Sequence, residues 1–132
     1  MKDPKLKQYS GGCHCGAVRF TVDAMEPFDI EDCNCSICRK AGTLHMIVPF
    51  ARFKLLQGQE SQSTYTFNSG VAKHHFCTHC GIKSFYIPRS NPDGVSINVR
   101  CLDGEPPVMN IVEFDGQNWE QNAHSLAHKS QV

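Results

Sequence analysis

Seven of the eight cysteines fall into three short motifs whose spacing is typical of metal binding. The motifs are Cys13-His14-Cys15, Cys33-Asn34-Cys35-Ser36-Ile37-Cys38 and Cys77-Thr78-His79-Cys80, and the eighth cysteine is Cys101. Zinc in proteins is usually held by four ligands in a tetrahedron, so each local pair needs a bend that aims two sulfurs at one point. The motifs therefore predict zinc chemistry, with two ions per chain.

The first and third motifs each end in a glycine, Gly16 and Gly81. Glycine tolerates the left-handed backbone that turns amides toward thiolates. Two glycine-closed pairs predict one structural zinc that ties the start of the domain to its middle. Its ligands would be Cys13, Cys15, Cys77 and Cys80. The alternative, buried cysteines acting as small apolar side chains, leaves the paired spacing unexplained.

The middle motif supplies three sulfurs in six residues and has no second pair nearby. Three protein ligands with an open fourth position are typical of a catalytic zinc. Cys33, Cys35 and Cys38 are therefore predicted to hold a second, open or labile zinc. Two alternatives remain, namely a closed site completed by Cys101 or a histidine, and an empty or redox-active thiol cluster.

Basic side chains near the middle motif are candidate substrate contacts. Arg39 and Lys40 directly follow Cys38, so they are the charges available to bind carboxylates if the substrate is an anionic thiol. Arg89 and Arg100 lie at or beyond predicted strand ends, where loops usually build sites. The alternative for each of them is a solvated basic surface.

The histidines have different expected roles. His45 is the candidate for a proton carrier or a partner of the metal ligands. His14 and His79 lie inside ligand pairs and are expected to point to solvent. His74 and His75 form part of a strand-like run, so one of them is expected to face inward as a core residue.

Short strands are the elements predicted to position these motifs. Val18–Val22 and Val95–Val99 alternate apolar and polar residues, which places the apolar side chains on one sheet face. Three Asp-Gly pairs in the second half of the chain predict turns. Only Asn118–Lys129 has the length and spacing for a helix. The pattern predicts a mainly β fold with little helix.

Composition narrows the possible partners of this chain of 132 residues. It has 13 basic and 13 acidic residues, and a net charge of zero argues against a domain-wide nucleic-acid surface. No apolar stretch approaches the about 20 residues of a spanning helix. Met1–Lys7 lacks the apolar run of a secretory signal. This predicts that the protein is in the cytoplasm, or in both the cytoplasm and the nucleus, where thiols stay reduced.

The three cysteine motifs, in this order, resemble the signature of glutathione-dependent formaldehyde-activating (GFA) domains. The resemblance runs from about Gly11 to Trp119, and Phe85–Pro92 resembles the centromere protein V-like branch. It implies a β-tent of coiled antiparallel sheets, with one zinc on four cysteines and a second on three. It also implies a carbon–sulfur lyase type of enzyme that forms S-(hydroxymethyl)glutathione from glutathione and formaldehyde.

This interpretation divides the chain into a polar lead-in (residues 1–10), a GFA-type zinc domain (11–120) and a C-terminal tail (121–132). The expected partner is glutathione or another small thiol. The alternative is a non-catalytic, zinc-stabilised binding module with a protein or chromatin partner. An open fourth position at the second metal favours the enzyme, and a fourth protein ligand favours the module.

Overall fold

The computed structural model describes residues 5–131, and strands dominate this part of the chain. The strands are β1 (Lys7–Gly12), β2 (Arg19–Ala24), β3 (Phe28–Cys33), β4 (His45–Pro49), β5 (Phe53–Gln57), β6 (Gln62–Tyr65), β7 (His74–Cys77), β8 (Phe85–Tyr86), β9 (Gly94–Asn98) and β10 (Met109–Phe114). The helices are α1 (Ser36–Ala41) and α2 (Trp119–Asn122), with 3₁₀ turns at Phe50–Arg52, Gln59–Ser61, Val99–Cys101, Gly116–Asn118 and Ala123–Ser130. The prediction of a mainly β fold is confirmed.

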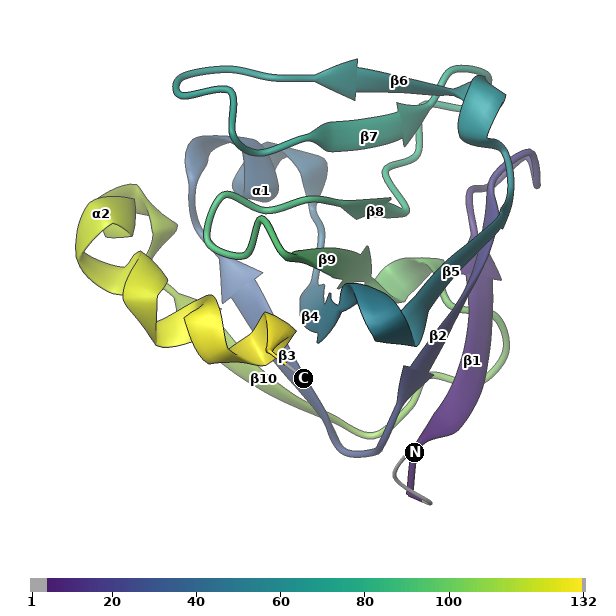
Figure 1. Cartoon of the computed structure of the whole chain (residues 1–132), viewed down its shortest axis with the longest axis horizontal. Coiled ribbons are helices and arrows are strands. Elements are labelled where there is room, and N and C mark those ends of the chain that lie inside the picture. The colour runs from purple at the N-terminus through teal and green to yellow at the C-terminus, as the bar shows by residue number, and fades with distance from the viewer. Residues whose placement is uncertain (1–4, 132) are drawn as a thin grey trace.

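The strands pair in three sheets, which Figure 1 shows side by side. One sheet has the order β1-β2-β5, the largest has the order β10-β3-β4-β9-β8, and β6 and β7 form a hairpin. β10 pairs with β3 in parallel, and the other pairings among the described strands are antiparallel. Figure 1 shows the largest sheet between the three-stranded sheet and the C-terminal helical segment, which contacts β4.

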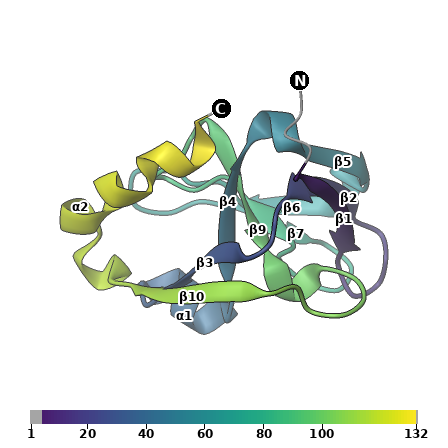
Figure 2. The same ribbon diagram turned by 90° about the horizontal axis from the view of Figure 1, so that it is seen from below.

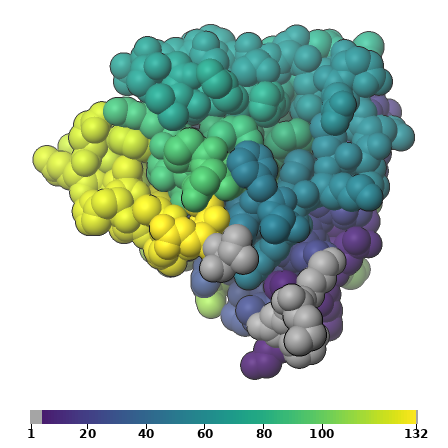
Figure 3. All heavy atoms as spheres, in the orientation of Figure 1, coloured from purple at the N-terminus to yellow at the C-terminus, as the bar shows by residue number. Residues whose placement is uncertain are grey.

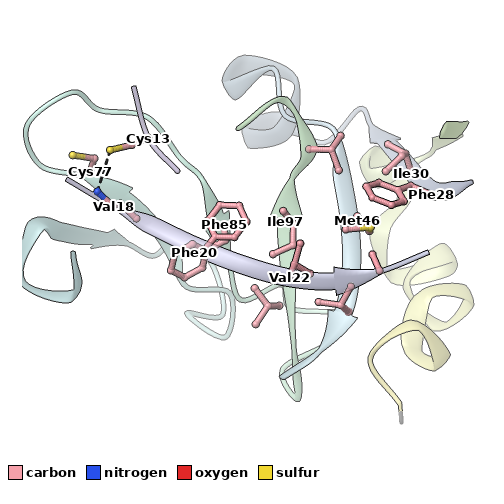
Figure 4. Close-up of a cluster of buried hydrophobic side chains, with 14 residues drawn as sticks. Cys13, Val18, Phe20, Val22, Phe28, Ile30, Met46, Cys77, Phe85 and Ile97 are labelled. Atoms are coloured by element: carbon pink, nitrogen blue, oxygen red, sulfur yellow. Dashed lines mark hydrogen bonds between the residues drawn. The ribbon is translucent and has the colours of Figure 1, made fainter. Parts of the chain in front are cut away.

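The apolar core lies between the sheets, where the alternating strands meet. Phe20 and Ile97 are fully buried, and the Phe20 ring packs near Phe85 with 6.3 Å between centroids. Figure 4 shows Cys13 and Cys77 at one end of this same core. Each large side chain buried there contributes about 1.5–3 kcal/mol to stability. The apolar residues of Val18–Val22 and Val95–Val99 are thus buried in the core as their alternation predicted, although Thr21 and Ser96 between them are buried as well.

Both ends of the described chain are more ordered than the sequence suggested. β1 begins at Lys7, within the predicted lead-in, whose residues 1–4 lie outside the described part. The expected helix over Asn118–Lys129 forms as α2 followed by the 3₁₀ turn Ala123–Ser130. Asn91 Nδ2 donates to the Leu126 carbonyl at 2.8 Å and to Ser130 Oγ at 2.9 Å. Residues 121–131 of the predicted tail are therefore packed against the rest of the domain, and Figure 3 shows them in yellow.

The edge strand β10 lies beside β3, with α1 close to both, as the view in Figure 2 shows. This arrangement brings the loop after β10 next to the segment between β3 and α1. Within residues 5–131, no helix has the length and apolar character needed to cross a membrane.

Candidate metal centres and the cavity beside them

The four-cysteine cluster brings together the first and third motifs. The sulfurs of Cys13, Cys15, Cys77 and Cys80 all lie within 4.8 Å of one another. Cys15 Sγ lies 3.6 Å from both Cys13 Sγ and Cys77 Sγ. A thiolate tetrahedron with Zn–S of about 2.3 Å has an edge of about 3.8 Å, whereas a disulfide bond is about 2.05 Å long. The geometry fits a metal held by four thiolates, and all eight cysteines are free.

Local backbone geometry builds each half of this cluster. Gly16 and Gly81 have φ of 84° and 76°, as their position after the cysteine pairs predicted. The Val18 amide donates to Cys13 Sγ at 3.3 Å. Hydrogen bonds from backbone amides, that of Cys80 first, lower the pKa of the Cys77 thiol. Amides directed at sulfur stabilise the thiolate form, which is the form that binds metal.

The three-cysteine cluster is built on one short segment. Cys33 ends β3, Cys35 is the N-cap of α1, and Cys38 lies in the first turns of that helix. Hydrogen bonds from the Cys33 and Cys38 thiols lower the pKa of Cys35 well below its ordinary value, and the Cys38 amide adds a further bond at 3.4 Å. These hydrogen bonds favour the thiolate form of Cys35, which is the form that binds metal.

No fourth ligand completes this second cluster within residues 5–131. The three sulfurs lie within 4.8 Å of one another, and no other Cys, His, Asp or Glu of that part joins them. Cys101, which the sequence left as a possible fourth ligand, places its sulfur 3.9 Å from the Lys83 carbonyl instead. The arrangement is consistent with a metal held by three protein ligands and open on the fourth side.

The loop after β10 holds the three-cysteine segment in place. The Asn34 amide donates to the Phe114 carbonyl at 3.2 Å, and the Gln117 amide donates to Asn34 Oδ1 at 3.0 Å. A Cβ added to Gly116 would lie 2.8 Å from Cys35 Cβ and would also contact Cys33 Sγ. The sequence predicted only a turn here, but the glycine is needed because the two loops approach so closely.

A cavity of about 480 Å³ opens beside this cluster, and all three cysteines line it. Its walls are more apolar than polar, include several aromatic rings and come from distant parts of the chain. Among these wall residues are Phe67, His74, Tyr86, Phe114 and Trp119. An apolar cavity with a few polar groups is the usual form of a small-molecule site. The cavity therefore gives the open side of the cluster a place for a ligand.

The basic residue that lines the cavity is Arg89, and not Arg39 or Lys40, which follow the middle cysteine motif. Arg39 and Lys40 are exposed on α1 and do not line the cavity. Arg89 does, and it is the only Lys or Arg among the lining residues of the described chain. Its guanidinium lies 4.0 Å from the Trp119 ring and 2.7 Å from a Glu120 carboxylate oxygen. Substrate contact by Arg39 and Lys40 stays a prediction.

His14 and His79, which lie within the sequence motifs of the four-cysteine cluster, are exposed as expected. His45 is buried, and its two ring nitrogens face the hydroxyl oxygens of Thr43 at 3.0 Å and Ser96 at 3.1 Å. Burial, aided by the charge of Lys83, lowers the pKa of His45 to about 4. Both nitrogens are engaged within the fold, so the structure favours a packing role over the predicted proton carrier.

Sequence reasoning missed several groups beside the cluster. Glu31 is buried on the same face of β3 as Cys33, and its Oε1 has no hydrogen-bond partner within residues 5–131. Its other oxygen lies 3.0 Å from Lys129 Nζ. The two-residue period of a strand could have identified Glu31. Nothing in the local sequence marks Lys83, and the resemblance of Phe85–Pro92 includes Tyr86 without indicating that its side chain lines the cavity.

Comparison with known proteins places these features in a family. The family described as "Glutathione-dependent formaldehyde-activating enzyme" matches residues 8–120. A protein of Halomonas elongata named "Putative glutathione-dependent formaldehyde-activating enzyme" is 30% identical over 105 residues, covering 74% of this chain and 67% of the relative. A crystal structure of a Rhodobacter sphaeroides protein has a TM-score of 0.69 and 37% identity, covering 74% of this chain and 91% of that one. The chain therefore belongs to the glutathione-dependent formaldehyde-activating family.

Proposed function

We propose that this chain is a zinc enzyme that joins glutathione to formaldehyde or a related small aldehyde, giving an S-(hydroxymethyl)glutathione-type adduct. One observation carries the proposal: three cysteines without a fourth protein ligand in residues 5–131 face a cavity large enough for a ligand. The family to which the chain belongs and the name of its relative support the same chemistry.

The metal and the protein would contribute different parts of this chemistry. Zinc bound by three thiolates lowers the pKa of a bound thiol and polarises a carbonyl oxygen. The protein would supply the three thiolate ligands, and hydrogen bonds to Cys35 favour its thiolate form. Its cavity would hold the two reactants next to each other, and such positioning lowers the barrier to reaction.

Two groups in the cavity suit the charged ends of glutathione, which carries two carboxylates and one ammonium group. Arg89 uses a guanidinium N–H toward Glu120 and has others left, so it can also bind a substrate carboxylate. The unpartnered Glu31 Oε1 can accept a hydrogen bond from an ammonium group. Besides Glu120, which pairs with Arg89, the cavity thus offers a cation and a carboxylate to a ligand whose thiol points at the cysteines.

We also propose that the chain belongs to the centromere protein V-like branch, a proposal that the resemblance of Phe85–Pro92 supports. Within that segment Arg89 lines the cavity, and Asn91 is fully buried against the C-terminal segment. The resemblance therefore includes residues that shape the site.

Calorimetric titration with glutathione tests the proposed function. Zinc-loaded protein should bind glutathione, and the matched variant Cys35→Ser should lose that binding while staying folded. The rate of adduct formation from formaldehyde, followed by magnetization-exchange NMR, should exceed the uncatalysed rate. Absence of binding at millimolar glutathione, with zinc confirmed at the three cysteines, would favour the non-catalytic binding module instead.

A further inference from the structure

Two buried histidines line the same cavity, and their ring nitrogens are used differently. His45 and His74 are each 4% exposed. Both nitrogens of His45 have hydroxyl partners. In His74 only Nδ1 has a partner within residues 5–131, which is Lys83 Nζ at 2.7 Å. Its Nε2 is left without a protein partner in the described chain, at the wall of the cavity.

Lys83 determines where the proton of His74 lies. An ammonium group can only donate hydrogen bonds, so His74 Nδ1 must be the acceptor. A neutral imidazole that accepts at one nitrogen carries its proton on the other. His74 therefore has its proton on Nε2, where it is a hydrogen-bond donor.

The surroundings of His74 keep the ring neutral and fixed in orientation. Burial first, and then the positive charge of Lys83, lower the pKa of His74 to about 4. The ring lies nearly parallel to those of Tyr86, at 4.8 Å and 13°, and Phe67, at 5.5 Å and 23°. Lys83 Nζ itself lies 4.0 Å from the Tyr86 ring centroid. Lysine, histidine and tyrosine thus form one packed unit beside the cysteines.

We propose that the Nε2–H of neutral His74 is the binding site for the substrate oxygen, namely the aldehyde carbonyl oxygen that becomes the hydroxyl of the adduct. This inference rests on the proposed function, because it assigns the group that meets the oxygen while the three-cysteine cluster faces the sulfur. A neutral imidazole polarises a carbonyl as a donor and keeps its own proton. Lys83 is a positioning residue, since it acts through His74.

The step balances without an oxidant or reductant. The thiol first releases its proton to water, and the thiolate sulfur then forms a bond to the carbonyl carbon. The electron pair of the C=O π bond moves to oxygen, where the hydrogen bond from His74 stabilises the developing negative charge. Water then protonates that oxygen to give the hydroxymethyl thioether, and the reverse reaction retraces these steps.

Kinetics of matched variants test the role of His74. In His74→Asn the side-chain oxygen takes the place of Nδ1 for Lys83, but the donor at the Nε2 position is lost. We expect kcat/KM for adduct formation to fall about 100-fold, as for loss of one oxyanion donor, with little change in glutathione affinity. His74→Gln places an amide near the Nε2 position and should restore part of the rate. A wild-type rate in His74→Asn would overturn the proposal.

His75 provides the control. It is the next residue on β7, does not line the cavity, and has its Nδ1 2.8 Å from Thr64 Oγ1. His75→Asn should leave kcat/KM unchanged. An equal loss in both variants would mean that disturbance of β7, rather than loss of a donor, slows the reaction, and would contradict the proposal.

NMR of the imidazole nitrogens tests the proposal without relying on turnover. The wild-type protein at neutral pH should show His74 as the Nε2–H tautomer, and Lys83→Met should weaken that preference. Added S-(hydroxymethyl)glutathione should shift the His74 Nε2–H resonance more than any His45 resonance. An Nδ1–H tautomer, an imidazolium, or no shift with adduct bound would refute the proposal. If the wild type shows no rate above background, the proposed function fails, while the tautomer and the shift still decide the role of His74.

Discussion

The two cysteine clusters are assembled by different parts of the fold. In the four-cysteine cluster, Cys15 contacts Cys77 across 62 residues of sequence, so two distant turns meet at one end of the core. The three-cysteine cluster lies within Cys33–Cys38 and is framed by α1 and the loop after β10. A metal at the first cluster cross-links the chain, whereas a metal at the second bridges one local segment.

This difference in loop length indicates that the two clusters have different roles. Closing a long loop removes more conformational freedom from the unfolded chain than closing a short one. Metal binding at a site that does not exist in the unfolded state adds directly to folding free energy. The closed cluster is therefore suited to stability, and the open cluster, which faces the cavity, is suited to binding a ligand.

The largest expected effect comes from breaking the closed cluster. Cys77→Ser should unfold the domain, because structural zinc contributes about 10 kcal/mol or more against a total stability of about 5–15 kcal/mol. Cys35→Ser, the matched change at the open cluster, should leave the domain folded. Circular dichroism and thermal unfolding of the two variants measure the difference. The opposite ranking would mean that the roles of the clusters are exchanged.

The second largest expected effect is a difference in how easily the two clusters lose metal. The purified protein should contain between one and two zinc ions per chain by elemental analysis, since its two clusters offer four and three thiolates. A chelator should remove zinc from the three-cysteine cluster first, because an open position admits a competing ligand. A chelator dye and circular dichroism follow zinc release and folding together. Loss of all zinc in one step with unfolding would contradict this order, and a folded, metal-free, disulfide-bonded sample would exclude both zinc sites.

A single methyl group should weaken metal binding at the open cluster alone. The Cβ of Gly116→Ala would lie 2.8 Å from Cys35 Cβ, and overpacking of this kind costs about 1–3 kcal/mol, or about five- to 150-fold in affinity. Gly104→Ala is the control, because its Cβ meets nothing within 4 Å and only the left-handed backbone is strained. Cobalt titration followed by absorbance measures the affinity of the cluster. Equal affinity in the two variants would show that the loop contact is not needed.

The smallest expected effect is on glutathione affinity. It compares Arg89, which lines the cavity, with Arg39 on α1. Arg89→Gln should weaken glutathione binding about tenfold, near the lower end of the about 1.5–3 kcal/mol of a charged hydrogen bond, since Arg89 also pairs with Glu120. Arg39→Ala should change affinity by about twofold or less, because that side chain is exposed outside the cavity. Calorimetry compares the two. A larger loss with Arg39→Ala would support the sequence-based assignment of the substrate contact to α1.

Local rules explain which features could be predicted. The positive φ of Gly16 and Gly81 follows from the turn that a pair of ligands requires, and the buried face of Val18–Val22 follows from strand period. Adjacency in sequence to a cysteine motif does not by itself place a basic side chain in the cavity. Residues one and two positions after a helical residue do not share its face, so Arg39 and Lys40 leave the cavity that Cys38 lines.

The grouping of the cysteines, the mainly β pattern and the family resemblance are all contained in the sequence, because they depend on residue type and on spacing over a few positions. The cavity and its chemistry depend on contacts between residues far apart in the chain. Lys83 meets His74 through the pairing of strands and turns, and Arg89 meets Trp119 because the C-terminal segment packs against the β8–β9 connection. Tertiary structure alone decides such contacts, since the free energy that places these side chains comes from packing of the whole core rather than from their immediate neighbours.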